Sequence, residues 1–240
     1  MEKILFACNL DGTLIHSHKR RRDGDICVEI YDGHPQSFIA PQALDMLKQI
    51  AAQMMFVPVT TRSIAQYRRI FWTEDFSPKT AVVANGAYIL DGDRQENLLR
   101  DEIATFADEL EHQRENFSAD KNFDICRIVD ESFLFLRCRD DVDFDALTFD
   151  TPLLVRHTGK KIYLFPPPLT KGNALRRLTA KFAPTQIIAA GDSEIDLPML
   201  ELADIAFAPK SLGGICADAP DFAEDFLRRI ISRQEFLTAR

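Results

Sequence analysis

KILFACNLDGTL, residues 3–14, joins a short apolar run to a turn of polar residues. The run at 3–8 is typical of a strand buried on both faces of a parallel sheet. Asn9, Asp11 and Thr13 follow directly, and ligands of open parallel sheets bind beyond the carboxyl ends of the strands. The segment therefore predicts a buried first strand with a functional loop after it.

Strand and helix patterns alternate in the first and last parts of the chain. Pro41 suits the first turn of a helix, and Leu44, Leu47 and Ile50 recur at helical spacing. Strands are expected at 54–59, 80–84, 186–190 and 205–208, and helices at 64–71, 172–183, 191–202 (after a loop) and 222–230. This alternation predicts an α/β fold with a doubly wound parallel sheet.

The middle of the chain breaks the alternation. A helical stripe at 103–110 and a short helix-like piece at 143–147 each precede two β-like runs, at 124–129 and 133–139 and at 152–156 and 161–165. Such a self-contained α+β unit predicts an inserted domain. We expect a core made of residues 1–90 and 166–240, with a cap at 91–165.

Composition limits the classes of function. A chain of 240 residues can form a core domain and a small second domain. The formal net charge of -8 argues against nucleic-acid binding, and the lack of an 18-residue apolar run argues against a membrane span. Five scattered cysteines without a C-x-x-C pair indicate reduced thiols, and no signal-peptide pattern is visible, so we expect a cytoplasmic protein.

Polar clusters follow strands or open helices at four places. They are NLDGT at 9–13, TTR at 60–62, KGN at 171–173 and GDSEID at 191–196. A helix cap or a turn would explain any one of them. Together they predict a phosphate and Mg²⁺ site, because gathered carboxylates repel each other unless a hard cation joins them. A lysine beside a helix N-terminus can neutralise the phosphate oxygens.

These motifs, together with NGA at 85–87, resemble those of the haloacid dehalogenase superfamily of aspartyl phosphatases. The resemblance covers the whole chain, and the insert is similar to the small C2-type cap of sucrose-phosphate, trehalose-phosphate and Cof-like phosphatases. It implies a Rossmann-like core with an α+β cap. It also implies Mg²⁺-dependent hydrolysis of a small phosphorylated metabolite, for example a sugar phosphate.

The resemblance assigns a role to each matching position. Asp11 would act as general acid and base, Thr60 would hydrogen-bond the phosphoryl group, and Lys171 would neutralise it. With the nucleophile position, the catalytic set would be Asn9, Asp11, Thr60 and Lys171. The residues implied for Mg²⁺ are Asn9, Asp11 (through its carbonyl), Asp192 and Asp196. Those implied for substrate are Thr61, Arg62 and Asn173.

Asn9 departs from the family pattern, since relatives carry an aspartate that becomes covalently phosphorylated. A neutral carboxamide is a poor nucleophile, so hydrolysis should be lost or severely slowed, although its oxygen can still ligate Mg²⁺ weakly. Asn9 is an introduced substitution, a native residue of a protein that binds phosphate without turnover, or a sign of an unusual mechanism or a sequence error. The alternative function is therefore a nucleophile-deficient protein that binds or senses a phosphorylated ligand.

The excursion at 16–38 is longer than a simple connection. Strand-like runs at 27–31 and 36–39 flank Asp32-Gly33, which predicts a hairpin. The excursion resembles the flap beside the active site in the same superfamily. We expect it to shield or select the substrate.

Overall fold

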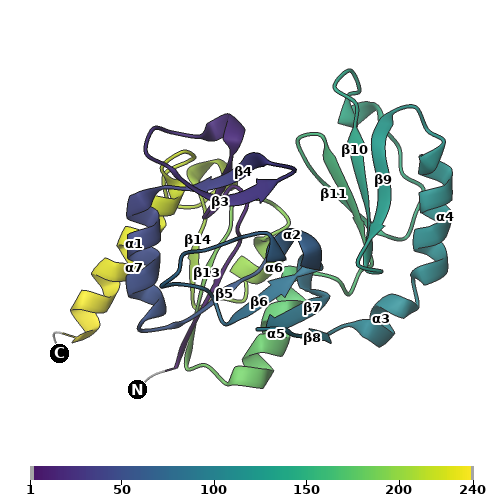
Figure 1. Cartoon of the computed structure of the whole chain (residues 1–240). Helices are drawn as coiled ribbons and strands as arrows, with labels where there is room; N and C mark the ends of the chain where they lie inside the picture. The colour runs from purple at the N-terminus through teal and green to yellow at the C-terminus, as the bar shows by residue number, and fades with distance from the viewer. Residues whose placement is uncertain (1–2, 239–240) are drawn as a thin grey trace.

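A computed structural model describes the backbone of residues 3–238 and the side chains of residues 3–233. At its centre lies a parallel sheet in the order β14-β13-β1-β5 (Figure 1). The strands are β1 (Ile4–Cys8), β5 (Met55–Pro58), β13 (Gln186–Ala190) and β14 (Ile205–Phe207). Residues 5–8 of β1 are fully buried, as predicted for a strand with neighbours on both sides and helices on both faces.

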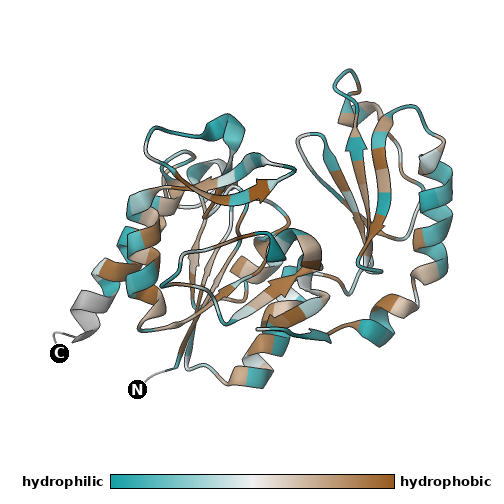
Figure 2. Cartoon of the chain, viewed as in Figure 1, coloured by the Kyte–Doolittle hydropathy of each residue, from teal (hydrophilic) through white to brown (hydrophobic). Residues whose placement is uncertain are grey.

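Successive side chains of β1 pack against different helices. Phe6 and Cys8 belong to a core that includes α1 (Pro41–Ala51) and α7 (Phe222–Thr238). Leu5 and Ala7 belong to a core that includes α5 (Lys171–Phe182) and α6 (Leu197–Leu200). The period of two along the strand thus produces the two helical layers of the sandwich. Figure 2 shows the apolar strands enclosed between helices whose outward sides are hydrophilic.

The third expected strand of the core is present as β6 (Thr80–Val83). It lies beside the β5 segment through a parallel bridge between Val59 and Val82. It then pairs antiparallel with β7 (Tyr88–Asp91), which pairs with β8 (Arg94–Asn97). The sequence interpretation did not predict β7 and β8. The expected helix at 64–71 is confirmed over a shorter span as α2 (Ile64–Arg68), which begins with a capping box at Ser63.

A second sheet, antiparallel throughout, is formed within residues 123–165. Its order is β11-β12-β10-β9, with β9 (Phe123–Val129), β10 (Phe133–Cys138), β11 (Leu154–Thr158) and β12 (Lys161–Phe165). The predicted helical stripe is two helices, α3 (Arg100–Ala104) and α4 (Ala107–Ser118), and the predicted piece at 143–147 is one 3₁₀ turn. Leu110 of α4 packs on one face of this sheet, and Figure 1 shows the unit standing beside the parallel sheet.

The predicted hairpin is confirmed as β3 (Ile26–Tyr31) and β4 (His34–Ile39), joined at Asp32 and Gly33. Both turn residues have positive φ, at 51° and 74°. A two-residue turn with this backbone geometry matches the twist of the flanking strands, and Asp-Gly is a preferred sequence for it. The short strand β2 (His16–Ser17) completes the sheet on the other side of β4. No helix within residues 3–238 is long and apolar enough to cross a membrane.

A buried charge cluster fixes the hairpin to the core. The carboxylate of Glu29 on β3 lies 2.8 Å from Arg62 and 3.0 Å from Arg69, and accepts a hydrogen bond of 2.6 Å from Ser37 on β4. Glu29 is only 3% exposed. Its desolvation favours the neutral form, but the charge of Arg62 and the hydrogen bonds outweigh that effect and lower the pKa of Glu29.

The contact between α5 and α6 predicts the effect of a methyl group at Gly172. A Cβ there would overlap the carbonyl group of Pro198. Alanine normally stabilises a helix by about 0.5–1 kcal/mol relative to glycine. We expect Gly172→Ala to do the reverse and to lower the free energy of unfolding by roughly 1–3 kcal/mol, measured by urea denaturation. A variant as stable as the wild type would contradict the close contact.

The cluster at Glu29 predicts a pH-dependent contribution to stability. Because the folded-state pKa is lowered, the stabilisation is present above the ordinary value of 4.5 and is lost as the pH falls below it. Glu29→Gln should lower the unfolding free energy at pH 7 by about 2–4 kcal/mol, and the difference should shrink at pH 3.5. Glu111→Gln, which breaks an exposed pair with Arg114, is the control and should change stability little at either pH.

Candidate functional site

A cavity of about 420 Å³ lies between the strand-end loops and the antiparallel sheet. The loops after β1, β5 and β13 and the start of α5 all contribute to its lining. The fold thereby joins residues as distant in sequence as Asn9 and Asp192, which are 183 residues apart and hydrogen-bonded. This position is the one expected for a ligand of an open parallel sheet.

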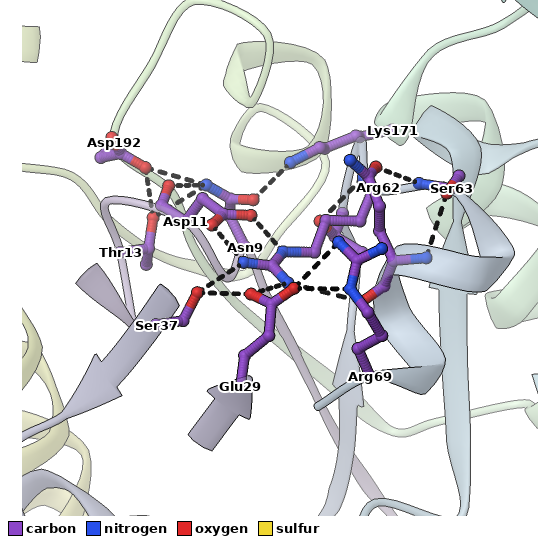
Figure 3. A network of polar contacts seen from close by, with 12 residues as sticks. Asn9, Asp11, Thr13, Glu29, Ser37, Arg62, Ser63, Arg69, Lys171 and Asp192 are labelled. Atoms are coloured by element: carbon purple, nitrogen blue, oxygen red, sulfur yellow. Dashed lines mark hydrogen bonds and ion pairs between the residues drawn. The ribbon is translucent and has the colours of Figure 1, made fainter. Parts of the chain in front are cut away.

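The Asn9 side chain lies at the centre of a polar network (Figure 3). Its Oδ1 accepts a hydrogen bond of 2.8 Å from Nζ of Lys171. Its Nδ2 lies 3.0 Å from the carbonyl oxygen of Asp11, 3.1 Å from Oγ1 of Thr13 and 2.8 Å from Oδ1 of Asp192. The amide nitrogen therefore occupies a point on which three oxygen atoms converge.

Asp192 is an incompletely neutralised carboxylate. Its partners are hydrogen-bond donors, the Asn9 amide and the Thr13 hydroxyl, the latter at 2.5 Å. Burial and the neighbouring charge of Asp196 raise the pKa of Asp192 to about 6, and the two hydrogen bonds offset this only in part. Gly12, with φ of 84°, passes so close that a Cβ there would overlap this carboxylate. The glycine of the NLDGT motif is thus required by packing and by backbone conformation.

Lys171 and Asp196 form a buried ion pair of 2.6 Å, with side chains 1% and 0% exposed. The other oxygen of Asp196 accepts hydrogen bonds from the backbone amides of Asp192 and Ser193, at 3.1 and 3.0 Å, and from the Ser193 hydroxyl at 2.9 Å. Both oxygens of Asp196 therefore accept hydrogen bonds from within the protein, one from Lys171 and the other from the 191–196 loop. This carboxylate holds the loop in place, and it does not line the cavity.

Asp11 is held by Arg62 in a two-point contact. Nε of Arg62 lies 2.6 Å from Oδ2 of Asp11, and Nη2 lies 2.7 Å from Oδ1. Desolvation of Asp11 favours its neutral form, yet the charge and hydrogen bonds of Arg62 prevail and lower the pKa of Asp11. Arg62 also contacts Glu29 of the hairpin, as Figure 3 shows. The ionised state of Asp11 thus depends on the same guanidinium that anchors the hairpin.

The predicted site residues divide into two groups by position. Six line the cavity: Asn9, Asp11, Thr61, Arg62, Lys171 and Asp192. Three predicted residues do not: Thr60, Asn173 and Asp196. Thr60 is fully buried, and its Oγ1 accepts a hydrogen bond from the backbone amide of Arg62. Asn173 donates to the carbonyl oxygen of Pro168 and accepts from Arg176, so both ends of its amide are used within α5 and the segment before it.

Glu29 and the cations of the antiparallel sheet are cavity residues that the sequence interpretation did not name. Glu29 had no signal of its own, because its partner Arg62 lies 33 residues away. Arg127, Arg137 and Lys161 also line the cavity. On the strands these cations alternate with apolar residues. That pattern could have placed them on one face of a sheet, since residues two apart share a face.

The donors around Asn9 fit a hard divalent cation. A carboxylate oxygen of Asp192 and the carbonyl oxygen of Asp11 converge there, and both are ligand types that Mg²⁺ prefers. Within residues 3–233, no group of three or more His, Cys, Asp and Glu side chains is placed to hold a metal. A cation at this point would therefore need the backbone oxygen and the Asn9 side chain, with the amide turned so that its oxygen faces the other two.

Comparisons with known proteins agree with this arrangement. A family model for haloacid dehalogenase-like hydrolases matches residues 143–211, which include Lys171 and the 191–196 loop. A phosphoglycolate phosphatase of Methanoculleus marisnigri is 36% identical over 76 residues, which make up 31% of this chain and 32% of that protein. The chain thus matches about a third of the length of this curated relative.

Solved structures share the fold at low identity. The sucrose-phosphatase of Synechocystis sp. PCC6803 has a TM-score of 0.58 at 18% identity, with 89% of this chain and 87% of that chain covered. A Thermoplasma acidophilum protein has a TM-score of 0.60 at 13% identity, with 98% and 99% covered. The C-terminal domain of the trehalose-6-phosphate phosphatase of C. albicans has a TM-score of 0.57 at 13% identity, with 83% and 73% covered.

The family match and the shared α/β fold support the same assignment. The expected α/β fold, a parallel sheet accompanied by a separate antiparallel sheet, is confirmed. Residues 143–211 thus match the haloacid dehalogenase-like hydrolases, and the fold of the chain is the one shared by the solved structures above.

Proposed function

We propose that the chain binds a small phosphorylated metabolite in this cavity and carries a Mg²⁺-dependent phosphatase apparatus that lacks its nucleophile. The main support is the position of Asn9, whose side chain joins Lys171 to the oxygens of Asp11 and Asp192. A carboxylate at this position would face a lysine on one side and two oxygens on the other. Such a group needs a cation beside it, and the lysine would balance the remaining charge.

Each part of the fold would have its own role in binding and catalysis. Residues 1–90 and 166–240 would form the catalytic core, and residues 91–165 would form the cap that covers the strand ends. Mg²⁺, when bound by Asp192, the Asp11 carbonyl and residue 9, would neutralise charge on the phosphoryl group. Lys171 would contact the same group from the other side, and Thr61 and Arg62 would orient it. Asp196 would keep Lys171 and the 191–196 loop in position.

The chemistry requires a carboxylate at position 9. One oxygen of that carboxylate attacks phosphorus, the bond to the leaving oxygen breaks, and Asp11 gives its proton to the leaving oxygen. In the second step, Asp11 takes a proton from water, which attacks phosphorus and releases phosphate and the free carboxylate. Arg62 favours the ionised form of Asp11 and so suits the second step. In the first step the dianionic phosphoryl group would compete for Arg62 and allow Asp11 to hold a proton.

The nature of the ligand is supported by the relatives. One relative is named a phosphoglycolate phosphatase, and structures that share the fold are a sucrose-phosphatase in complex with sucrose and phosphate and a trehalose-6-phosphate phosphatase. All of these act on small phosphate monoesters. A sugar phosphate is one candidate for this chain, and the cavity volume of about 420 Å³ is of the size that holds small molecules.

A second function is favoured by one observation. The Asn9 amide donates into the oxygen cluster, so the buried oxygens are satisfied without a cation. A native asparagine would then serve a protein that binds or senses a phosphorylated ligand without hydrolysing it.

The proposed function predicts the effect of restoring the nucleophile. Asn9→Asp should hydrolyse p-nitrophenyl phosphate with Mg²⁺ at least roughly 10³-fold faster than the wild type, since it restores a covalent route. Asn9→Ala is the matched control and should stay at the wild-type level. Activity that appears only in the aspartate form supports a phosphatase apparatus that lacks its nucleophile. Equal rates in all three forms would refute that apparatus and leave the binding function.

The proposed function also predicts how Mg²⁺ changes the stability of these variants. Mg²⁺ should raise the melting temperature of Asn9→Asp much more than that of the wild type, because only the aspartate form presents an uncompensated oxygen cluster. At a concentration about 100 times its dissociation constant, Mg²⁺ should add about 2.7 kcal/mol to the stability. Asn9→Asp combined with Asp192→Asn should lose this response. An equal shift in the wild type and Asn9→Asp would contradict the role of the amide.

A further inference from the structure

Three cations on the inner face of the antiparallel sheet line the cavity. Because side chains alternate along a strand, Arg127 of β9, Arg137 of β10 and Lys161 of β12 lie on the face opposite to α4. In the strand register, Arg127 is paired with Phe135, and Arg137 is paired with Lys161. All three cations line the cavity that also contains Asn9.

The pairing of Arg137 with Lys161 is unfavourable for the sheet itself. Like charges directly opposite each other on neighbouring strands destabilise the pair. The carboxylates near Arg137 are Asp124 at 3.7 Å and Asp140 at 4.0 Å, both exposed, and such pairs contribute little. Among the side chains of residues 3–233, no carboxylate forms an ion pair within 4.0 Å of Arg127 or Lys161. The pairing of Arg137 with Lys161 therefore costs the sheet stability, and this cost points to a role in binding; Arg127 lies over the Phe135 ring instead, 5.6 Å from its centroid.

The charge of the cavity is opposite to that of the whole chain. Six Lys and Arg residues and three Asp and Glu residues line the cavity, although the chain has a formal charge of -8. The three carboxylates are already engaged, Asp11 and Glu29 by arginines and Asp192 by hydrogen bonds. No acid in the lining is left to balance the cations of the antiparallel sheet.

Lys161 shares the cavity with the strand-end loops. It lines the same cavity as Asn9, Asp11 and Asp192. Tyr163, two residues further along β12, lines the same cavity. A small ligand with its phosphoryl group beside Asn9 could therefore reach the cations of the sheet with a second group.

We propose that Arg127, Arg137 and Lys161 bind a second anionic group of the substrate. The substrate class is then a phosphate ester that also carries a carboxylate or a second phosphate. This inference rests on the proposed function of the cavity. Arginine can hold either group through two parallel hydrogen bonds, and lysine adds a charge-assisted one. A ligand with a neutral second half would leave these cations unneutralised in a partly enclosed space.

The test compares ligands that differ in one group. Dissociation constants are measured by calorimetry at fixed ionic strength with Mg²⁺, using the wild-type chain. One pair is 3-phosphoglycerate and glycerol 3-phosphate, which differ in a carboxylate; the other is fructose 1,6-bisphosphate and fructose 6-phosphate. We expect the ligand with the extra anion to bind about tenfold more tightly in at least one pair, and the responding pair identifies the second group.

Variants assign the preference to the sheet. Lys161→Gln and Arg127→Gln should reduce the ratio of the two affinities within the responding pair towards one. They should leave the affinity for the ligand without the second anionic group nearly unchanged. Lys160→Gln is the matched control, because the Lys160 ammonium donates to the carbonyl oxygen of Val142 and its residue does not line the cavity. It should leave the ratio unaltered. Circular dichroism confirms that the exposed substitutions leave the fold intact.

Two results would overturn the inference in distinguishable ways. Equal affinities within both pairs, or a preference that survives in Lys161→Gln and Arg127→Gln, would reject the second anion site and leave the proposed function standing. Failure of all four ligands to bind would reject the proposed function and the inference together.

Discussion

The geometry of the site depends on the buried ammonium group of Lys171. It lies between Asp196, at 2.6 Å, and the carbonyl oxygen of the Asn9 side chain, at 2.8 Å. Removing either partner of a buried ion pair leaves an uncompensated charge, which costs several kcal/mol. Through Asp196 the same pair fixes the backbone of the loop that presents Asp192. One interaction thus connects α5, the loop after β13 and the loop after β1.

The two sides of the cavity use charge differently. On the core side, carboxylates are paired with cations of the same chain, as Asp11 is with Arg62. The Asn9 amide donates hydrogen bonds to the nearby oxygens of Asp11 and Asp192. On the side of the antiparallel sheet, Arg137 lies opposite Lys161, and the ion pairs of Arg137 with Asp124 and Asp140 are exposed. The core side has the composition of a reaction centre, whereas the sheet side has the composition of a surface for an anion.

The parallel core and the hairpin were predictable from sequence because each has a local signal. Buried strands appear as apolar runs, and Asp32-Gly33 is a turn with a defined backbone. The hairpin of β7 and β8 was missed although its turn, Gly92-Asp93, contains a glycine of positive φ, because β8 is short, polar and exposed. The convergence of Asn9, Lys171 and Asp192 followed from their places at strand ends and, for Lys171, at the start of a helix. The directions of Asn173 and Asp196, and the pairing of Glu29 with Arg62, depend on side-chain contacts between distant segments, which no local pattern encodes.

The anchoring of the hairpin fixes one wall of the cavity. Lifting β3 and β4 would separate the Glu29 carboxylate from Arg62 and Arg69, which both belong to the segment after β5. Breaking such buried contacts costs free energy, so the hairpin is held rigidly against the core. The antiparallel sheet is held to the core differently: Val129, Phe133 and Tyr163 share a buried apolar cluster with Ala84 and Ile195, and Asp130 accepts a hydrogen bond from the Ile64 amide. One wall of the cavity is therefore fixed mainly by buried charge and the opposite wall mainly by apolar contacts.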